Sequence, residues 1–177
     1  MKRTTLAGHP CSVARTLDVA GEWWTLLIVR DVAYGVSRFR AIQADLGISA
    51  NVLAERLDSL VADRVLERVV YQQRPLRHEY ALTEKGAELV PILLALAAWG
   101  DRWAWGSGSG PVRVEHSECG HEVSVEVRCP ECERAAAPRE LRARLRDPAA
   151  LPPAADGPGS VSARHLRAGG EGVPLQV

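Results

Sequence analysis

The chain has no excess of charge of either sign. It holds 22 Lys and Arg residues and 22 Asp and Glu residues among 177, so its formal net charge is zero. A strong overall field toward nucleic acid is therefore excluded, and any nucleic-acid interface must depend on a local patch of charge. With 46% hydrophobic and 25% charged residues, the composition indicates a globular domain of ordinary size with appendages.

Long apolar runs and common enzyme motifs are also missing. The longest apolar stretch, residues 89–100, is too short to cross a bilayer, and the first twelve residues lack the apolar core of a signal peptide. We therefore expect a cytoplasmic protein without membrane contact. The sequence has no HExxH, Walker A, GxGxxG or GxSxG motif, which favours a protein that is not an enzyme.

Cysteine is scarce, and three of the four cysteines gather in one segment, "HSECGHEVSVEVRCPECE". Without a secretory signal, such thiols indicate metal ligation, redox chemistry or reduced cysteines rather than a disulfide framework. Alternating valines predict a short hairpin that brings a C-x-H pair and a C-P-x-C pair together around a tetrahedral, structural Zn2+. The alternatives are a thiol pair open to oxidation and inert surface cysteines. The predicted ligands are Cys119, His121, Cys129 and Cys132, with His116 as a spare.

Changes of composition divide the chain into four parts. Residues 1–105 carry the periodic apolar patterns of a folded domain, and "GSGSGP" at 106–111 is typical of a flexible linker. Residues 112–146 hold the Cys/His hairpin. Residues 147–177 are rich in Pro, Gly, Ala and Ser, which predicts a disordered tail. The expected fold class is mainly α with a small β-hairpin (α+β).

Two helices joined at a glycine predict a helix-turn-helix. The first, residues 37–47, ends in Gly47, and the second, "ISANVLAERLDSL", places its leucines on one face. Ser49 is placed to cap the second helix. In a helix-turn-helix the N-terminal residues of such a second helix contact the bases. The alternative is any small helical bundle.

A hairpin rich in arginine follows. "LERVVY" and "RHEYALT" are strand-like runs separated by a loop that contains Pro75, and no acidic residue occurs between positions 68 and 78. A hairpin with a basic tip after a helix-turn-helix is typical of a winged helix, in which the wing contacts phosphates. The alternative is an ordinary solvated hairpin.

A final helix, beginning after Thr83 and bent at Pro91, is expected to reach about residue 104. Its apolar stripe, with Trp99 and Trp103 near the end, is wide for one small core and indicates a partner subunit. Alternatively, the first helix and the tryptophans near residue 23 cover the stripe within one chain.

Several blocks of residues 10–105 occur in an order that resembles a known family. They are "CSVARTLDVAGEWWTLLIVRDV", "SRFRAIQADLGISANVLAERLDSL", "LERVVYQQRPLRHEYALTEKGAEL" and "PILLALAAWG". Together they resemble the HxlR-type winged helix-turn-helix transcriptional regulators of bacteria. The resemblance implies DNA binding as a dimer, an interface made by the N- and C-terminal helices, and action as a repressor or an activator.

The resemblance also implies which residues meet the DNA. Asn51 suits adenine, and Ala50 or Val52 suits a thymine methyl group. Arg64 stands where relatives often have glycine, so an unfavourable backbone is expected there. The expected DNA-binding residues are Arg38, Ser49, Ala50, Asn51, Val52, Glu55 and Arg56, with Arg74 and Arg77 in the wing.

Cys11 aligns with a cysteine that senses oxidants or electrophiles in some members of this family. A reactive thiol needs a lowered pKa and access to solvent. The alternative is a small thiol packed at the dimer interface. A small molecule or an oxidant is accordingly a candidate effector.

The sequence thus predicts a homodimeric regulator, a repressor rather than an activator, on a pseudo-palindromic operator in double-stranded DNA. One alternative is a winged-helix module for protein contact. The other is a redox- or zinc-responsive sensor without sequence-specific DNA binding. A steep loss of affinity with salt would favour DNA.

Overall fold

The computed structural model describes residues 5–106, 110–147, 166 and 172–175. The chain forms two compact units, Val19–Val125 and a second one made of Met1–Asp18 with Glu126–Val177. None of the helices in these described ranges has the length and apolar character needed to traverse a bilayer.

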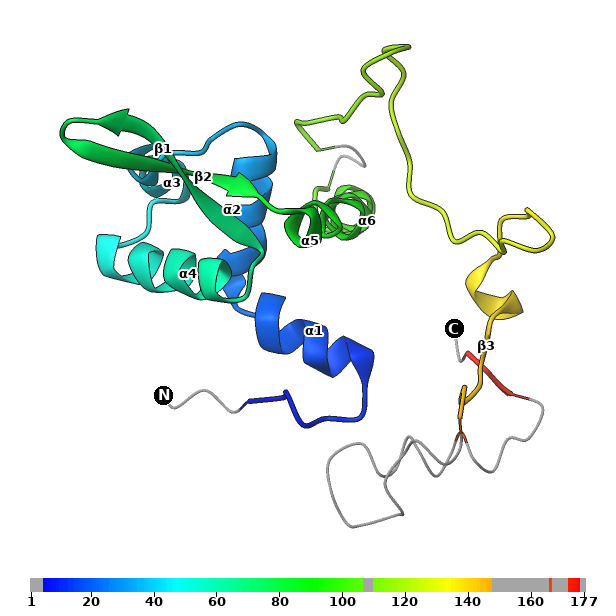
Figure 1. Ribbon diagram of the computed structural model, residues 1–177. Helices are drawn as coiled ribbons and strands as arrows, with labels where there is room; N and C mark the ends of the chain where they lie inside the picture. Colours follow the sequence, from blue (N-terminus) through cyan, green and yellow to red (C-terminus); the bar gives the residue numbers. More distant parts are fainter. Residues whose placement is uncertain (1–4, 107–109, 148–165, 167–171, 176–177) are drawn as a thin grey trace. The chain divides into compact units, whose positions relative to one another are not determined.

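The larger unit has the order of elements expected of a winged helix-turn-helix (Figure 1). Helix α1 (Ser12–Ala20) leads into it across the boundary between the units. The predicted α+β fold class is confirmed. Its elements are α2 (Trp23–Ala33), α3 (Phe39–Leu46), α4 (Ala50–Ala62), β1 (Leu66–Gln73), β2 (Leu76–Leu82), α5 (Glu84–Ala87) and α6 (Val90–Trp103).

Helix α2 lies at the centre of this unit and contacts α3, α4, α6 and β2. Its Ile28 and Val29 are fully buried. The leucine face of α4 packs into the same core, and its three predicted members, Leu53, Leu57 and Leu60, are all buried. A buried leucine of this kind stabilises the fold by roughly 1.5–3 kcal/mol, so this face determines which side of α4 is left for solvent.

The turn between α3 and α4 follows the predicted chemistry. Gly47 ends α3 in the left-handed region, with φ of 64°, and its N–H donates to the carbonyl of Gln43. Ser49 caps α4, because its hydroxyl accepts a hydrogen bond of 3.3 Å from the N–H of Val52. The first turn of α4 is therefore held at a fixed position relative to α3.

The base of the hairpin is closed by a corner of the chain around Arg64. This residue has φ of 56°, which confirms the expected unfavourable backbone. The Thr83 hydroxyl donates to the Arg64 carbonyl at 2.6 Å and accepts the N–H of Gly86 at 3.1 Å. A Cβ at Gly86 would lie 2.1 Å from the Val65 carbonyl oxygen, so only glycine fits there.

The helical segment after Thr83 differs from the expectation of one long helix bent at Pro91. Thr83 caps the short α5, and α6 begins separately at Val90. Pro91 lies in the first turn of α6, where the N–H that proline lacks would have no partner within the helix. The proline therefore marks a helix start, and the predicted bend is wrong.

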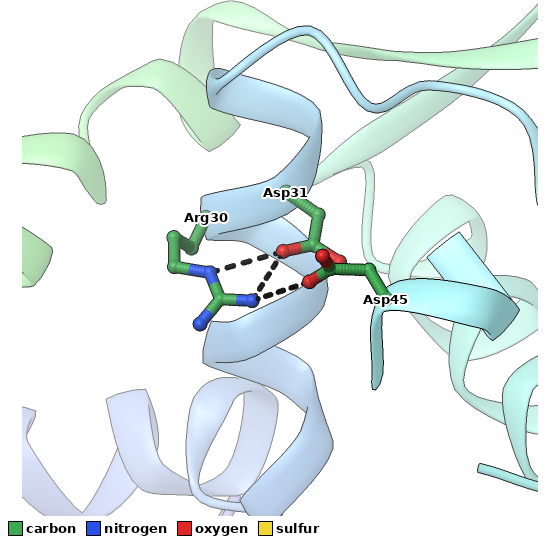
Figure 2. Close-up of polar contacts among 3 residues, drawn as sticks. All are labelled: Arg30, Asp31 and Asp45. Carbon is green, nitrogen blue, oxygen red and sulfur yellow. Dashed lines mark hydrogen bonds and ion pairs between the residues drawn. The ribbon is translucent and has the colours of Figure 1, made fainter. Parts of the chain in front are cut away.

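A buried carboxylate links α2 to α3 (Figure 2). Asp31 is 2% exposed, and its Oδ1 accepts hydrogen bonds from Arg30 Nε at 3.0 Å and Nη2 at 2.5 Å. The same Nη2 also donates to Asp45 Oδ2 of α3 at 2.9 Å. Asp31 Oδ2 has no hydrogen-bond partner among the described residues. Burial raises the pKa of Asp31 above its ordinary value of 3.8, against the opposing effect of Arg30.

Apart from the start of α1, the described residues of the smaller unit form only short regular elements. Near the N-terminus, the N–H of Leu6 donates to Asp18 Oδ1 at 2.7 Å. A 3-10 turn (Pro138–Glu140) precedes β3 (Arg142–Ala143), which pairs antiparallel with β4 (Val173–Pro174). Most of the predicted disordered tail and residues 107–109 of the predicted linker lie outside the described residues.

The raised pKa of Asp31 predicts a pH-dependent contribution to stability. The folded chain binds the Asp31 proton more tightly than the unfolded chain does, so the free energy of unfolding falls as pH rises between the two pKa values. Relative to Asp31→Asn, the wild type should lose stability as pH rises above about 3.8, in urea unfolding at a series of pH values. An advantage of the wild type that grows with pH would contradict this origin.

Candidate nucleic-acid interface

The face of α4 opposite its leucines is available to a partner. Of the residues predicted to face the groove, Ser49, Ala50, Asn51 and Glu55 are exposed, whereas Val52 and Arg56 are half-buried. The small side chains at 49–51 leave the backbone of the first helical turn accessible. The structure thus places short polar and apolar groups, without a free positive charge, at the leading end of α4.

Arg56 is held by two acidic residues. Its guanidinium lies 3.0 Å from Glu55 Oε1 and 3.8 Å from Glu22 Oε2, and only 15% of its side chain is exposed. The charge of this predicted DNA contact is therefore countered within the unit. A role of Arg56 in DNA binding stays a prediction, and its contacts show that it also joins α4 to the segment before α2.

The tip of the β1–β2 hairpin carries the uncompensated positive charge. Arg74 and Arg77 are both exposed, and neither forms an ion pair within the part of the chain that the structure describes. The strands pair antiparallel from Leu66 with Leu82 to Gln73 with Leu76. The predicted hairpin is confirmed, and its tip projects away from the core (Figure 1).

A basic groove lies between the hairpin and the start of α3. It measures about 460 Å³ and brings together Arg38 and Arg77, both predicted, with residues that sequence reasoning missed. The Arg38 guanidinium lies 4.3 Å from the centre of the Tyr71 ring, beside the irregularity in β1 between Val70 and Gln72. The missed lining residues are Arg40, Tyr71 and His78.

Arg38 is also tied to β2. Its Nε lies 3.7 Å from Glu79 Oε2, which accepts a hydrogen bond of 3.2 Å from the Ser37 hydroxyl. The backbone joins the same parts, because the N–H of Tyr80 donates to the Ser37 carbonyl at 2.8 Å. These contacts fix the hairpin against the residues that precede α3.

The start of α4 and the tip of the hairpin lie on the same side of the larger unit (Figure 1). A duplex placed against that side would meet short side chains of α4 and arginines of the hairpin together. Phosphates are bound by exposed guanidinium groups, whereas bases are read by side chains that enter a groove. The arrangement is therefore suited to binding phosphates and recognising bases in the same duplex.

The predicted zinc ligands are divided between the two units. Cys119 and His121 belong to the larger unit, and Cys129 and Cys132 to the smaller one. Among the residues described, no group of three or more His, Cys, Asp or Glu side chains is arranged to hold a metal ion. Hydrogen bonds from the backbone N–H groups of Cys132 and Glu131 lower the pKa of the Cys129 thiol. Zinc binding stays a prediction.

Cys11 is exposed at the start of α1. Its carbonyl accepts the N–H of Arg15 at 3.0 Å, and the Arg15 guanidinium turns to the carbonyl of His9 at 2.9 Å. The thiol is accessible in a single chain, which both a sensing role and packing against a partner subunit require. Neither role is tested by these contacts, so sensing at Cys11 stays a prediction.

Residues 19–107 match the family described as HxlR-like helix-turn-helix. The chain is 39% identical over 121 residues to the uncharacterized HTH-type transcriptional regulator Rv3095 of Mycobacterium tuberculosis H37Rv. The aligned residues make up 68% of this chain and 77% of Rv3095. It is also 39% identical over 90 residues to the uncharacterized HTH-type regulator YvaP of Bacillus subtilis 168, over 50% of this chain and 83% of the relative.

Two solved structures are similar over more than the winged helix. PA1607, described as a candidate transcription factor, has a TM-score of 0.71 and 36% identity over 80% of this chain and 98% of its own. PA1374 of Pseudomonas aeruginosa has a TM-score of 0.55 and 35% sequence identity. The match covers 80% of this chain and 95% of PA1374. Because 80% of 177 residues is about 142, both matches extend beyond residues 19–107.

The cap on α4 can be tested by two substitutions at one position. Ser49→Ala should lower the free energy of unfolding by about 1 kcal/mol, because the N–H of Val52 loses its acceptor. Ser49→Asp should keep most of that stability, because a carboxylate accepts the same bond and suits the positive end of the helix dipole. Urea unfolding measures both variants. Equal stability of the Ala variant and the wild type would show that the bond does not stabilise α4.

Proposed function

The chain belongs to the HxlR-like helix-turn-helix family of transcriptional regulators, and we propose that it represses transcription as a homodimer bound to a pseudo-palindromic operator in double-stranded DNA. Repression needs nothing beyond occupancy, since a dimer seated on an operator blocks access to that DNA. A regulator that binds bacterial DNA in this way would act in the cytoplasm.

The observation that carries this proposal is that the start of α4 and the tip of the hairpin lie on the same side of the larger unit (Figure 1). The short side chains of Ala50 and Asn51 allow the first turn of α4 to approach base edges closely. The Asn51 amide can donate to and accept from adenine, and the Ala50 methyl group suits thymine. Positive charge that attracts phosphate comes from the hairpin, since Arg56 is paired with Glu55 and Glu22.

The basic groove extends the phosphate contacts toward α3. Arg38, Arg40 and Arg77 line it, and each phosphate neutralised by such a side chain releases counterions from the duplex. A chain of zero net charge thus binds DNA through one local surface. Affinity for any duplex should accordingly depend steeply on salt, whereas sequence preference should depend on α4.

The homodimer is supported by the exposed apolar face of α6. None of the 14 residues of α6 is buried, although the helix is rich in leucine, alanine and tryptophan. The four large exposed side chains occur at spacings of four, three and four residues, which places them on one stripe. They are Ile92, Leu96, Trp99 and Trp103.

Such a stripe is the kind of surface that a second copy covers. Trp99 and Trp103 are 64% and 69% exposed, and burial of a large apolar side chain contributes roughly 1.5–3 kcal/mol. A two-fold dimer presents two α4 helices, so its half-sites would be about 34–36 Å apart, one turn of DNA. The operator should therefore be symmetric about its centre.

Selection from random duplex DNA tests the proposed operator. The wild-type protein should enrich a two-fold symmetric site, and its affinity should fall steeply between two salt concentrations. Arg74→Ala should weaken binding to all sequences and lower the salt slope by about one, whereas Asn51→Ala should change the preferred bases. Arg113→Ala, which removes an equal charge outside α4 and the hairpin, serves as the control. Folded protein that enriches no sequence would refute operator binding.

The dimer is tested by a charge placed on the apolar stripe of α6. Leu96→Glu should shift the chain from dimer to monomer in sedimentation equilibrium, because an ionised carboxylate would be buried in the interface. Ala98→Glu is the matched control: it is exposed on the same helix, about 200° around from Leu96. A Leu96→Glu protein that stays dimeric would place the interface elsewhere.

A further inference from the structure

The tip of the β1–β2 hairpin presents one large apolar side chain to solvent. Leu76 is 59% exposed and lies outside the hydrophobic core of the described residues. The whole of the tip, residues 73–78, is exposed. A single exposed leucine is common on protein surfaces, so the role of this one depends on what surrounds it.

The neighbours of Leu76 are cations. Gln73 and Leu76 form the last pair of the ladder, so the turn between the strands consists of Arg74 and Pro75 alone. Arg77 follows Leu76 directly, and both arginines are exposed. The leucine therefore lies between two guanidinium groups at the narrow end of the hairpin. Apolar surface flanked by positive charge on both sides is complementary to a groove lined by phosphates rather than to an apolar protein pocket.

The turn is closed by a side chain of its own strand. Gln72 Nε2 donates a hydrogen bond of 2.9 Å to the Arg74 carbonyl. The register of β1 shifts between Val70 and Gln72, and an irregularity of this kind increases the local twist of a strand. The tip is thus a shaped loop beyond the part of the hairpin that packs on the core, and a preformed loop loses less conformational entropy when it binds.

A turn of two residues has the width of a DNA minor groove. Paired strands lie about 4.8 Å apart, whereas the minor groove of B-DNA is about 6 Å wide and the major groove about 12 Å. The tip of the hairpin lies on the same side of the larger unit as the start of α4 (Figure 1). With α4 in a major groove, the tip would meet the neighbouring minor groove of the same duplex.

We propose that Leu76 enters this minor groove and wedges apart one base step, with Arg74 and Arg77 holding the groove on either side. The inference rests on the operator binding proposed above. Apolar side chains inserted between base pairs unstack them partly and kink the duplex toward the major groove. The two arginines supply the positive charge that a narrow minor groove attracts.

A wedge at the hairpin tip gives the protein a second way to select DNA. Pyrimidine–purine steps such as TA and CA/TG unstack easily, whereas A-tracts are stiff, so the energy of the kink depends on the sequence that is kinked. Leu76 would therefore select a flexible step without a hydrogen bond to any base. Because the proposed dimer has two hairpins, an operator should hold one such step in each half.

The wild-type, full-length protein tests the wedge on the operator obtained by selection from random DNA. Permanganate oxidises thymines that are unstacked, so binding should make one thymine reactive at a symmetric position in each half-site. Energy transfer between dyes at the two ends of the duplex should report a bend of roughly 20–90° at each kink. The reactive thymines also identify the wedged step.

Variants of the tip then connect the kink to Leu76. Replacing the flexible step by AA should weaken wild-type binding by about tenfold, within the range of one mismatched base pair, whereas Leu76→Ala should bind both operators equally. Its salt slope should equal that of the wild type, because no charge is lost. Leu76→Met should restore the difference, since methionine also acts as a wedge. Val69→Ala is the matched control, because Val69 is a 40% exposed apolar residue of the same hairpin away from its tip.

The outcomes separate this inference from the proposed function. An operator that is bound but stays straight, without reactive thymines, would overturn the wedge and leave operator binding intact. A Leu76→Ala protein that still distinguishes the two steps would overturn it as well. Loss of self-association by Leu76→Ala in sedimentation equilibrium would show that the leucine contacts a second copy instead. Failure of the folded wild type to bind any operator would refute both proposals.

Discussion

Burial of α2 is the constraint on which the nucleic-acid interface depends. Helices α3, α4 and α6 and strand β2 all contact this helix, so each has its position set against the same buried side chains. The polar face of α4 is exposed because its leucines are used against α2. The stripe on α6 is exposed because that helix gives only part of its surface to the same core. One buried helix therefore orients both the proposed surface for DNA and the proposed surface for a second subunit.

The positive charge that would attract phosphate and the side chains that would recognise bases lie on different elements. The leading end of α4 carries no free cation, since Arg56 is paired, whereas the arginines at the hairpin tip are unpaired within the described chain. Attraction to phosphate is sequence-independent, and a surface without it discriminates by shape and hydrogen bonds. A regulator with zero net charge can thus bind one duplex site without attracting polyanions over its whole surface.

Local patterns predicted the parts of the fold that depend on neighbouring residues. Leucine spacing identified the buried face of α4, Gly47 marked the turn, and β-branched runs marked the hairpin. The pairing of Arg56 with Glu22 and the groove that contains Arg40 and His78 were not predictable, because each depends on packing between distant segments.

Position 86, in the corner beneath the hairpin, does not accommodate any amino acid other than glycine. Every other amino acid has a Cβ, and a Cβ at this position would lie 2.1 Å from the Val65 carbonyl oxygen. Each missense mutation of this codon therefore displaces backbone, whatever the chemistry of the new side chain. The residue lies in α5, between the end of β2 and the start of α6. One missense mutation there would therefore disturb the backbone between the hairpin and the apolar helix, so a single residue affects the positions of both.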